Sequence, residues 1–185
     1  MVQGSYPCNK DSRIVIFYHY ASDFQEGFEQ CQGFSVLSSH FAITMEKIIY
    51  LTRRERFNSA HKLWNPEWDA EKNANVFGKC SNPNWHGHNY ELFVTVKGTP
   101  QEDTGFTMDL KVLSDLVEEK VISKLDHKNL NLDVDFMHGK MASAENIAIA
   151  IWEQLEEAIR TSGCKLHSIK LYETENNIVE YFGGN

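Results

Sequence analysis

One thiol and two imidazoles lie close together between Cys80 and Tyr90, a stretch that reads C-S-N-P-N-W-H-G-H-N-Y. His86 and His88 are two residues apart, and alternate positions of a β-strand project to the same face. Imidazole is a common zinc ligand, and three protein ligands with an open fourth position is the arrangement of a catalytic zinc site. The spacing therefore predicts part of a metal site, although an isolated H-x-H also occurs often by chance.

A third histidine stands at the end of the preceding strand pattern, in F-N-S-A-H, and is His61. If the two strands pair antiparallel, the end of the first lies near the start of the second. That pairing would bring His61 beside His86 and His88 and complete a three-imidazole site with one position open for substrate. Considered alone, His61 would be an exposed histidine at a strand end.

Cys80 precedes the two paired histidines by a short loop and allows three interpretations. It could be a fourth metal ligand that closes a structural site, a thiolate whose pKa is lowered by a nearby metal and imidazole, or a buried inert thiol. Asp126-His127 is an acid-histidine couple that could activate such a thiol. The alternative for that couple is ordinary loop and capping chemistry.

Glu173 carries a charge on a predicted apolar strand face, because Ile169 and Leu171 share its parity. Burying a carboxylate costs free energy unless a partner satisfies it. Its two acceptor oxygens suit a guanidine-like edge with adjacent N–H donors, such as arginine or a 2-aminopterin ring. The alternative is a glutamate at a strand end that faces water.

Length and charge narrow the class of protein. A chain of 185 residues with 42% hydrophobic and 24% charged residues is ordinary for one soluble globular domain, or one domain with an appendage. The net charge of −8 argues against nucleic acid as the main partner, because phosphate contacts need basic patches. No apolar run approaches the length of a membrane span. Because no cysteines form a C-x-x-C pair, we expect free thiols in a reducing compartment, and the four are Cys8, Cys31, Cys80 and Cys164.

Apolar periodicity predicts an α+β protein with an antiparallel sheet. Strand patterns cover about residues 46–58, 86–97, 165–173 and 178–182, and helical spacing covers 109–125 and 144–159. Asp109 and Ser143 suit the N-caps of the two helices. Turn signals before Gly105 predict a hairpin-like return through residues 106–108, and a helical turn is expected near 69–76.

The first part of the chain differs from the rest. Residues 1–44 are rich in Ser, Gly, Gln and Phe and lack sustained periodicity, and every motif described above follows Met45. We expect residues 1–44 to be a poorly ordered N-terminal extension, followed by one domain over residues 45–185.

Five segments together resemble the 6-pyruvoyltetrahydropterin synthase family, and the resemblance covers roughly Lys47 to Gly183. The segments are F-N-S-A-H, F-G-K-C-S-N-P-N-W-H-G-H-N-Y, L-D-H-K-N-L, S-A-E-N-I-A and L-Y-E-T-E-N-N. The resemblance implies a T-fold subunit, with a four-stranded antiparallel sheet and two helices on one face. It also implies a homohexamer in which two trimers stack into a barrel, with active sites between subunits.

The resemblance implies a role for each of the candidate residues. The metal would be Zn²⁺, and the catalytic cysteine would be Cys80. The Asp126-His127 pair would come from a neighbouring subunit, and Glu173 would anchor the pterin ring. A Thr-Thr-Glu segment of the family, which helps to bind substrate, is here Ser143-Ala144-Glu145, so one hydroxyl is replaced by a methyl group. The implied zinc ligands are His61, His86 and His88.

The substrate implied by the resemblance is 7,8-dihydroneopterin triphosphate, with elimination of triphosphate to give 6-pyruvoyltetrahydropterin for tetrahydrobiopterin synthesis. An alternative is the 6-carboxytetrahydropterin synthase branch of queuosine biosynthesis, which releases acetaldehyde from the same substrate. That branch typically has a shorter spacing between the cysteine and H-G-H and lacks the E-T-x-N-N ending, so this chain favours the pyruvoyl branch. A second alternative is a non-catalytic pterin-binding oligomer, against which Cys80 and the Asp126-His127 pair argue. We expect a cytoplasmic location.

Overall fold

Two long antiparallel strands form the centre of the sheet, and they set the position of the candidate site. The computed structural model describes residues 47–184, so the predicted extension over residues 1–44 lies outside the described residues. Strand β1 (Ile49–His61) pairs with β2 (His86–Gly98) along its whole length. The register places His61 directly opposite His86. The end of β1 and the start of β2 therefore lie at the same end of the sheet, where the predicted metal ligands lie.

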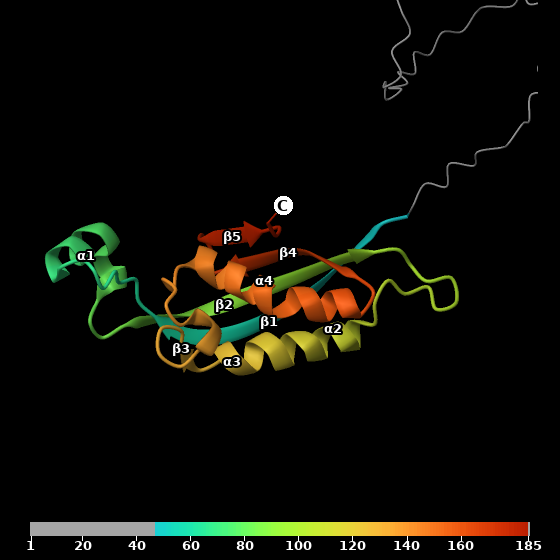
Figure 1. Ribbon diagram of the computed structural model, residues 1–185, viewed down its shortest axis with the longest axis horizontal. Helices are drawn as coiled ribbons and strands as arrows, with labels where there is room; N and C mark the ends of the chain where they lie inside the picture. The colour runs from blue at the N-terminus through green and yellow to red at the C-terminus, as the bar shows by residue number, and fades with distance from the viewer. Residues whose placement is uncertain (1–46, 185) are drawn as a thin grey trace, which may run out of the picture. The chain divides into compact units, whose positions relative to one another are not determined.

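Three further strands complete the sheet, in the order β3-β1-β2-β4-β5 (Figure 1). Strand β4 (Lys165–Tyr172) pairs antiparallel with β2, and β5 (Ile178–Tyr181) pairs antiparallel with β4. Strand β3 (Lys128–Asn129) lies parallel to the end of β1. The sheet thus has five strands and not the predicted four. Strand β3 has only two residues, and so short a segment carries no alternating pattern that a sequence could display.

The predicted helices cover one face of this sheet (Figure 1). Helix α2 (Leu110–Val117) continues through a π-helical segment (Glu118–Ile122) into α3 (Ser123–Leu125), and α4 is Ala144–Thr161. The Asp109 carboxylate accepts a hydrogen bond from the backbone N–H of Lys111, and Ser143 caps α4. Both predicted N-caps are confirmed. The prediction of two helices on one face is also correct, with the first interrupted by a wider turn.

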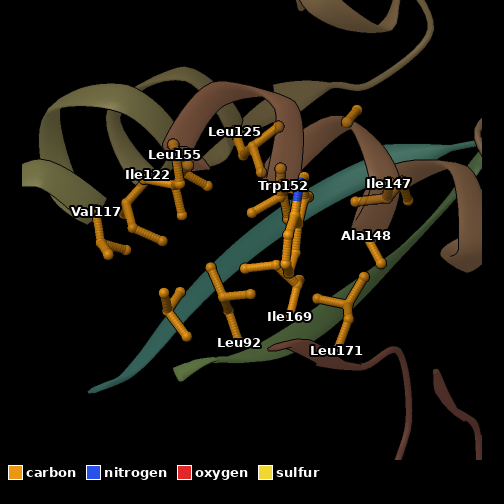
Figure 2. Close-up of a cluster of buried hydrophobic side chains, with 14 of the residues drawn as sticks. Leu92, Val117, Ile122, Leu125, Ile147, Ala148, Trp152, Leu155, Ile169 and Leu171 are labelled. Carbon is orange, nitrogen blue, oxygen red and sulfur yellow. The ribbon is translucent and has the colours of Figure 1, made fainter. Parts of the chain in front are cut away.

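A continuous apolar core fills the space between the helices and the sheet (Figure 2). Each fully buried aliphatic side chain contributes about 1.5–3 kcal/mol to folding. Alternation along β2 directs one side of that strand toward the helices. The labelled core residues are Leu92, Val117, Ile122, Leu125, Ile147, Ala148, Trp152, Leu155, Ile169 and Leu171. This packing fixes the strand ends that carry the histidines.

Two loops differ from the sequence-based expectation. The segment between β1 and β2 contains a full helix, α1 (Ala70–Phe77), followed by a 3₁₀ turn over Gly78–Ser81. The predicted return strand over residues 106–108 is wrong: this segment is irregular, and Thr107 and Met108 are buried against the rest of the domain. A second 3₁₀ turn covers Asp135–Met137.

None of the described helices is both long and apolar enough to cross a membrane.

Candidate active site

The three predicted metal ligands meet at the end of the β1–β2 ladder. The imidazole centroids of His61 and His86 are 4.4 Å apart, and that of His88 lies 5.1 Å from each. One ligand nitrogen from each residue can be chosen so that all three lie within 4.8 Å of one another. Zinc–nitrogen bonds of ~2.1 Å place the ligands of one ion at comparable separations. The geometry therefore fits a three-histidine metal site.

Hydrogen bonding and burial prepare His61 as a ligand. Its Nδ1 lies 2.7 Å from the carbonyl oxygen of Ala142, an acceptor, so Nδ1 carries the proton and Nε2 keeps its lone pair. That Nε2 is buried and has no hydrogen-bond partner among the described residues. Burial is the main cause that lowers the pKa of His61 and also that of His86. Neutral imidazoles with free lone pairs are the metal-binding form.

The loop between β1 and β2 returns Cys80 to this edge. Asn73 in α1 is fully buried, and its side-chain amide donates to the carbonyl oxygens of Asn65, Trp68 and Asp69. This network folds the loop back on itself. The backbone N–H of Leu63 then donates to the carbonyl oxygen of Cys80 at 2.8 Å, so the cysteine lies beside the chain that follows His61. The thiol is half-buried.

A lysine between two indole rings joins the two ends of this loop. The Lys62 ammonium lies 5.0 Å from the centroid of Trp64 and 4.6 Å from that of Trp85. Trp85 has a φ of 66°, which is unusual for a bulky side chain. Lys62 directly follows His61, and Trp85 directly precedes His86. The cation–π contact between them therefore continues the contact between β1 and β2 beyond their last paired residues, His61 and His86.

Glu173 reaches the same cluster from β4. Its Oε1 lies 3.6 Å from Nε2 of His61 and 3.9 Å from Nε2 of His88, and the side chain is 18% exposed. The turn to β5 holds it in place, because the backbone N–H of Glu173 donates to the carbonyl oxygen of Asn177 at 3.0 Å. The prediction that this carboxylate lies on the apolar side of the strand agrees with its position. The Glu173 carboxylate therefore presents acceptor oxygens beside the histidine cluster.

Asp126 and His127 form the predicted couple but stand apart from the cysteine. His127 Nδ1 lies 2.7 Å from Asp126 Oδ2, and the backbone N–H of Asn58 donates to Asp126 Oδ1 at 2.8 Å. That backbone hydrogen bond is the first cause that lowers the pKa of Asp126. The His127 side chain is 77% exposed. It shares an open hollow of 430 Å³ with His88, yet no contact joins the pair to Cys80 among the described residues.

The predicted substrate-binding segment begins helix α4. The Ser143 hydroxyl accepts a hydrogen bond from the backbone N–H of Asn146 at 3.4 Å, and Glu145 is exposed in the first turn. The residue before the cap, Ala142, provides the carbonyl that orients His61. The segment therefore lies next to the histidine cluster.

The comparisons with known proteins agree with this geometry. A family model described as 6-pyruvoyl tetrahydropterin synthase matches residues 50–184. The chain belongs to this family. It is similar to the "6-pyruvoyl tetrahydrobiopterin synthase" of Dictyostelium discoideum, with 43% identity over 75% of this chain and 99% of that protein. It is also similar to the Homo sapiens protein of the same name, with 41% identity over 72% of this chain and 90% of that protein.

A solved 6-pyruvoyl tetrahydropterin synthase from Caenorhabditis elegans has the same fold. Its TM-score is 0.70 at 32% identity, and the match covers 75% of this chain and 98% of that structure. The T-fold assignment is therefore supported by sequence and by structure.

Two members of the site were missed from sequence. Ala142 acts through its carbonyl oxygen, for which a side-chain pattern gives no signal. Tyr90 lies with the histidines, its ring centroid 5.7 Å from that of His88, and its parity with His86 and His88 was the available signal. Burial, then the charges of Glu173 and Cys80, raise the pKa of Tyr90. The phenol is therefore held in its neutral, protonated form.

Proposed function

We propose that this chain is a zinc-dependent lyase that converts 7,8-dihydroneopterin triphosphate into 6-pyruvoyltetrahydropterin with elimination of triphosphate. One observation carries the proposal: three imidazoles and Glu173 converge at one end of the sheet, where the loop also brings Cys80 beside the chain that follows His61. The similarity to proteins named 6-pyruvoyl tetrahydrobiopterin synthase supports this choice of reaction.

In the proposed reaction, some side chains bind the substrate and others hold the metal. Glu173 accepts hydrogen bonds from the adjacent N–H donors of the pterin ring and orients the substrate. Ser143 and Glu145, beside the cluster, provide further polar contacts to the substrate. A zinc ion held by His61, His86 and His88 would act as a Lewis acid that makes the C–H bond beside a side-chain oxygen more acidic.

Proton transfer is the task of the thiol. The Cys80 thiolate takes the proton from the substrate side chain as general base. The Asp126-His127 couple supplies a second acid–base group, in which the carboxylate orients the imidazole through Nδ1. The first proton removed is delivered to the C=N bond of the pterin ring, which is thereby reduced to the tetrahydro level while the first side-chain carbon becomes a ketone. Loss of a second proton from the next carbon expels triphosphate, and the resulting enol becomes the second ketone.

We propose a homohexamer, a dimer of trimers that closes into a barrel, with active sites between subunits. The described sheet supports this arrangement because both of its edges are open. Strand β1 pairs with β3 only at Ser59 and Ala60, and β5 pairs only with β4 within the described chain. Open strand edges are templates for pairing with another chain.

Removal of single imidazoles tests the metal site. The His86→Ala and His88→Ala proteins should each lose most of the zinc that elemental analysis finds at about one ion per wild-type chain, because two protein ligands rarely hold zinc. The matched control is His167→Ala, which removes an imidazole that contacts Tyr50 on β1 and Phe182 just after β5. Full zinc retention by both site variants would show that His86 and His88 are not zinc ligands.

Product analysis tests the reaction. Purified enzyme given 7,8-dihydroneopterin triphosphate should release inorganic triphosphate and 6-pyruvoyltetrahydropterin, separated by chromatography. Both branches of the family begin with proton abstraction from the side chain, so the outcome depends on how the substrate is held. Stoichiometric acetaldehyde in a coupled aldehyde assay, with 6-carboxytetrahydropterin, would assign the chain to the other branch. Binding of the pterin without turnover would make it a non-catalytic binding protein.

A further inference from the structure

The hydroxyl group of Tyr90 is buried beside the candidate site without a hydrogen-bond partner among residues 47–184. The residue is 0% exposed, and its ring is stacked on Phe57 with a centroid separation of 4.8 Å. Burying a hydroxyl without a partner costs about 1–3 kcal/mol. Native proteins keep few such groups, and each one calls for a physical explanation.

The position of this hydroxyl indicates where its hydrogen-bond acceptor could bind. The three buried side-chain polar atoms without a partner in the described chain are Nε2 of His61, Nδ1 of His86 and the Tyr90 hydroxyl. The Tyr90 ring contacts the rings of His61 and His88, at 6.2 Å and 5.7 Å between centroids. A metal ion can take up imidazole lone pairs, but a phenol O–H needs an acceptor. An acceptor bound at the histidine cluster would satisfy it.

The register of the sheet supports the same location. The last residues paired between β2 and β4 are Glu91 and Tyr172, so the next position along the ladder sets Tyr90 opposite Glu173. The Glu173 carboxylate nevertheless accepts no hydrogen bond from the phenol in the described part of the chain; it accepts one from the side-chain amide of Asn177. The phenol ring thus contacts two histidine rings and occupies the ladder position opposite the proposed pterin anchor.

We propose that the Tyr90 hydroxyl donates a hydrogen bond to a side-chain oxygen of the bound substrate and is a further catalytic residue. The inference rests on the proposed function. When Cys80 removes the proton from the first side-chain carbon, the electron pair of that C–H bond moves into the adjacent C=N bond of the pterin ring. The enol that results then gives up its hydroxyl proton as it becomes a ketone, and negative charge develops on that oxygen in this step. A buried donor already aimed at that oxygen stabilises the charge without reorganisation, and the phenol keeps its proton throughout.

The Tyr90→Phe substitution tests this role because it removes only the hydroxyl. The ring and its stacking on Phe57 remain, and the zinc content should not change. Loss of a buried donor that has no protein partner should leave Tm unchanged or raise it. Turnover should fall by about 10–10³-fold, mainly in kcat, as for other donors to a developing oxyanion. The control is Tyr181→Phe, at a ring that packs on Trp152 instead.

Ligand binding provides a readout that does not depend on turnover. The probes are 6-acetyl-7,8-dihydropterin, which has a side-chain carbonyl, and 6-methyl-7,8-dihydropterin, which has none. We expect Tyr90→Phe to weaken binding of the acetyl compound about three- to tenfold, the range for one hydrogen bond, and to bind the methyl compound as wild type does.

Other outcomes overturn the inference. Wild-type values for both probes and for kcat would show that the hydroxyl touches no substrate. Equal losses for both probes would place its action at the pterin ring, and a lower Tm with normal kinetics would show a structural role. If the zinc-loaded wild-type protein bound neither probe and released no triphosphate, the proposed function would fail and this inference with it.

Discussion

Replacing Cys80 by alanine should abolish most turnover while leaving the zinc and the fold in place. Loss of a positioned general base costs about 10²–10⁴ in rate, which would take kcat close to the limit of detection. The Cys80 side chain is half-buried, and its thiol makes no hydrogen bond within residues 47–184. Its removal should therefore change Tm little. Elemental analysis, thermal unfolding and triphosphate release on the same preparation measure all three quantities.

The matched control for this experiment is Cys164→Ala. That thiol is buried and donates to the carbonyl oxygen of Thr107, and neither residue takes part in the proposed chemistry. Its loss should lower Tm through the lost contact and leave kcat of the folded enzyme unchanged. If zinc leaves with the Cys80 thiol, then Cys80 is a fourth ligand, the metal site is structural, and the proposed base has to be found elsewhere.

The metal cluster was the part of the site most accessible to sequence reasoning. Alternation in β1 and β2 is strong on one face, and a shift of one residue would turn that face away from the core. The register was therefore constrained, and antiparallel pairing then placed His61 opposite His86, as the structure has it. Local patterns sufficed because the ligands belong to neighbouring strands of one ladder.

The loop that carries Cys80 could not be predicted in the same way. Its return to β1 depends on a buried Asn73 amide with several backbone acceptors, and such a network has no periodicity. The position of Tyr90 opposite Glu173 could not be predicted for another reason. It depends on the pairing of β2 with β4, which contains a register shift between Thr95 and Val96. A bulge of this kind changes the register beyond it and is not visible in an alternating pattern.

The π-helical segment before Asp126 was also missed. The residues from Leu110 to Leu125 have one continuous apolar spacing, and a π turn uses the same residue types as an α-helix. Helix α3 follows this segment, and the chain then leaves the helix for the Asp126-His127 couple. The backbone N–H of Asn58 donates to the Asp126 carboxylate, and the backbone N–H of His127 donates to the carbonyl oxygen of Asn58, so the couple is fixed beside β1. The couple thereby projects from the edge of the sheet.

That position leads to the second large expected effect, restoration of activity by mixing two inactive proteins. Cys80→Ala lacks the proposed base and His127→Ala lacks the proposed second acid–base group, so each alone should be nearly inactive. His127 is 77% exposed, and its removal should not disturb folding. If each active site combines Cys80 of one subunit with His127 of a neighbour, co-expression of the two variants should regenerate intact sites at some interfaces.

Random mixing of the two chains should restore about a quarter of the sites, the fraction of interfaces at which both intact residues meet. Separate affinity tags allow mixed oligomers to be purified and their triphosphate release compared with wild type. Co-expression of Cys80→Ala with Cys80→Ser is the matched control, because no mixture of these chains contains an intact thiol. Mixed oligomers of Cys80→Ala and His127→Ala that stay as inactive as either parent would contradict shared sites, since the couple would then act within its own chain.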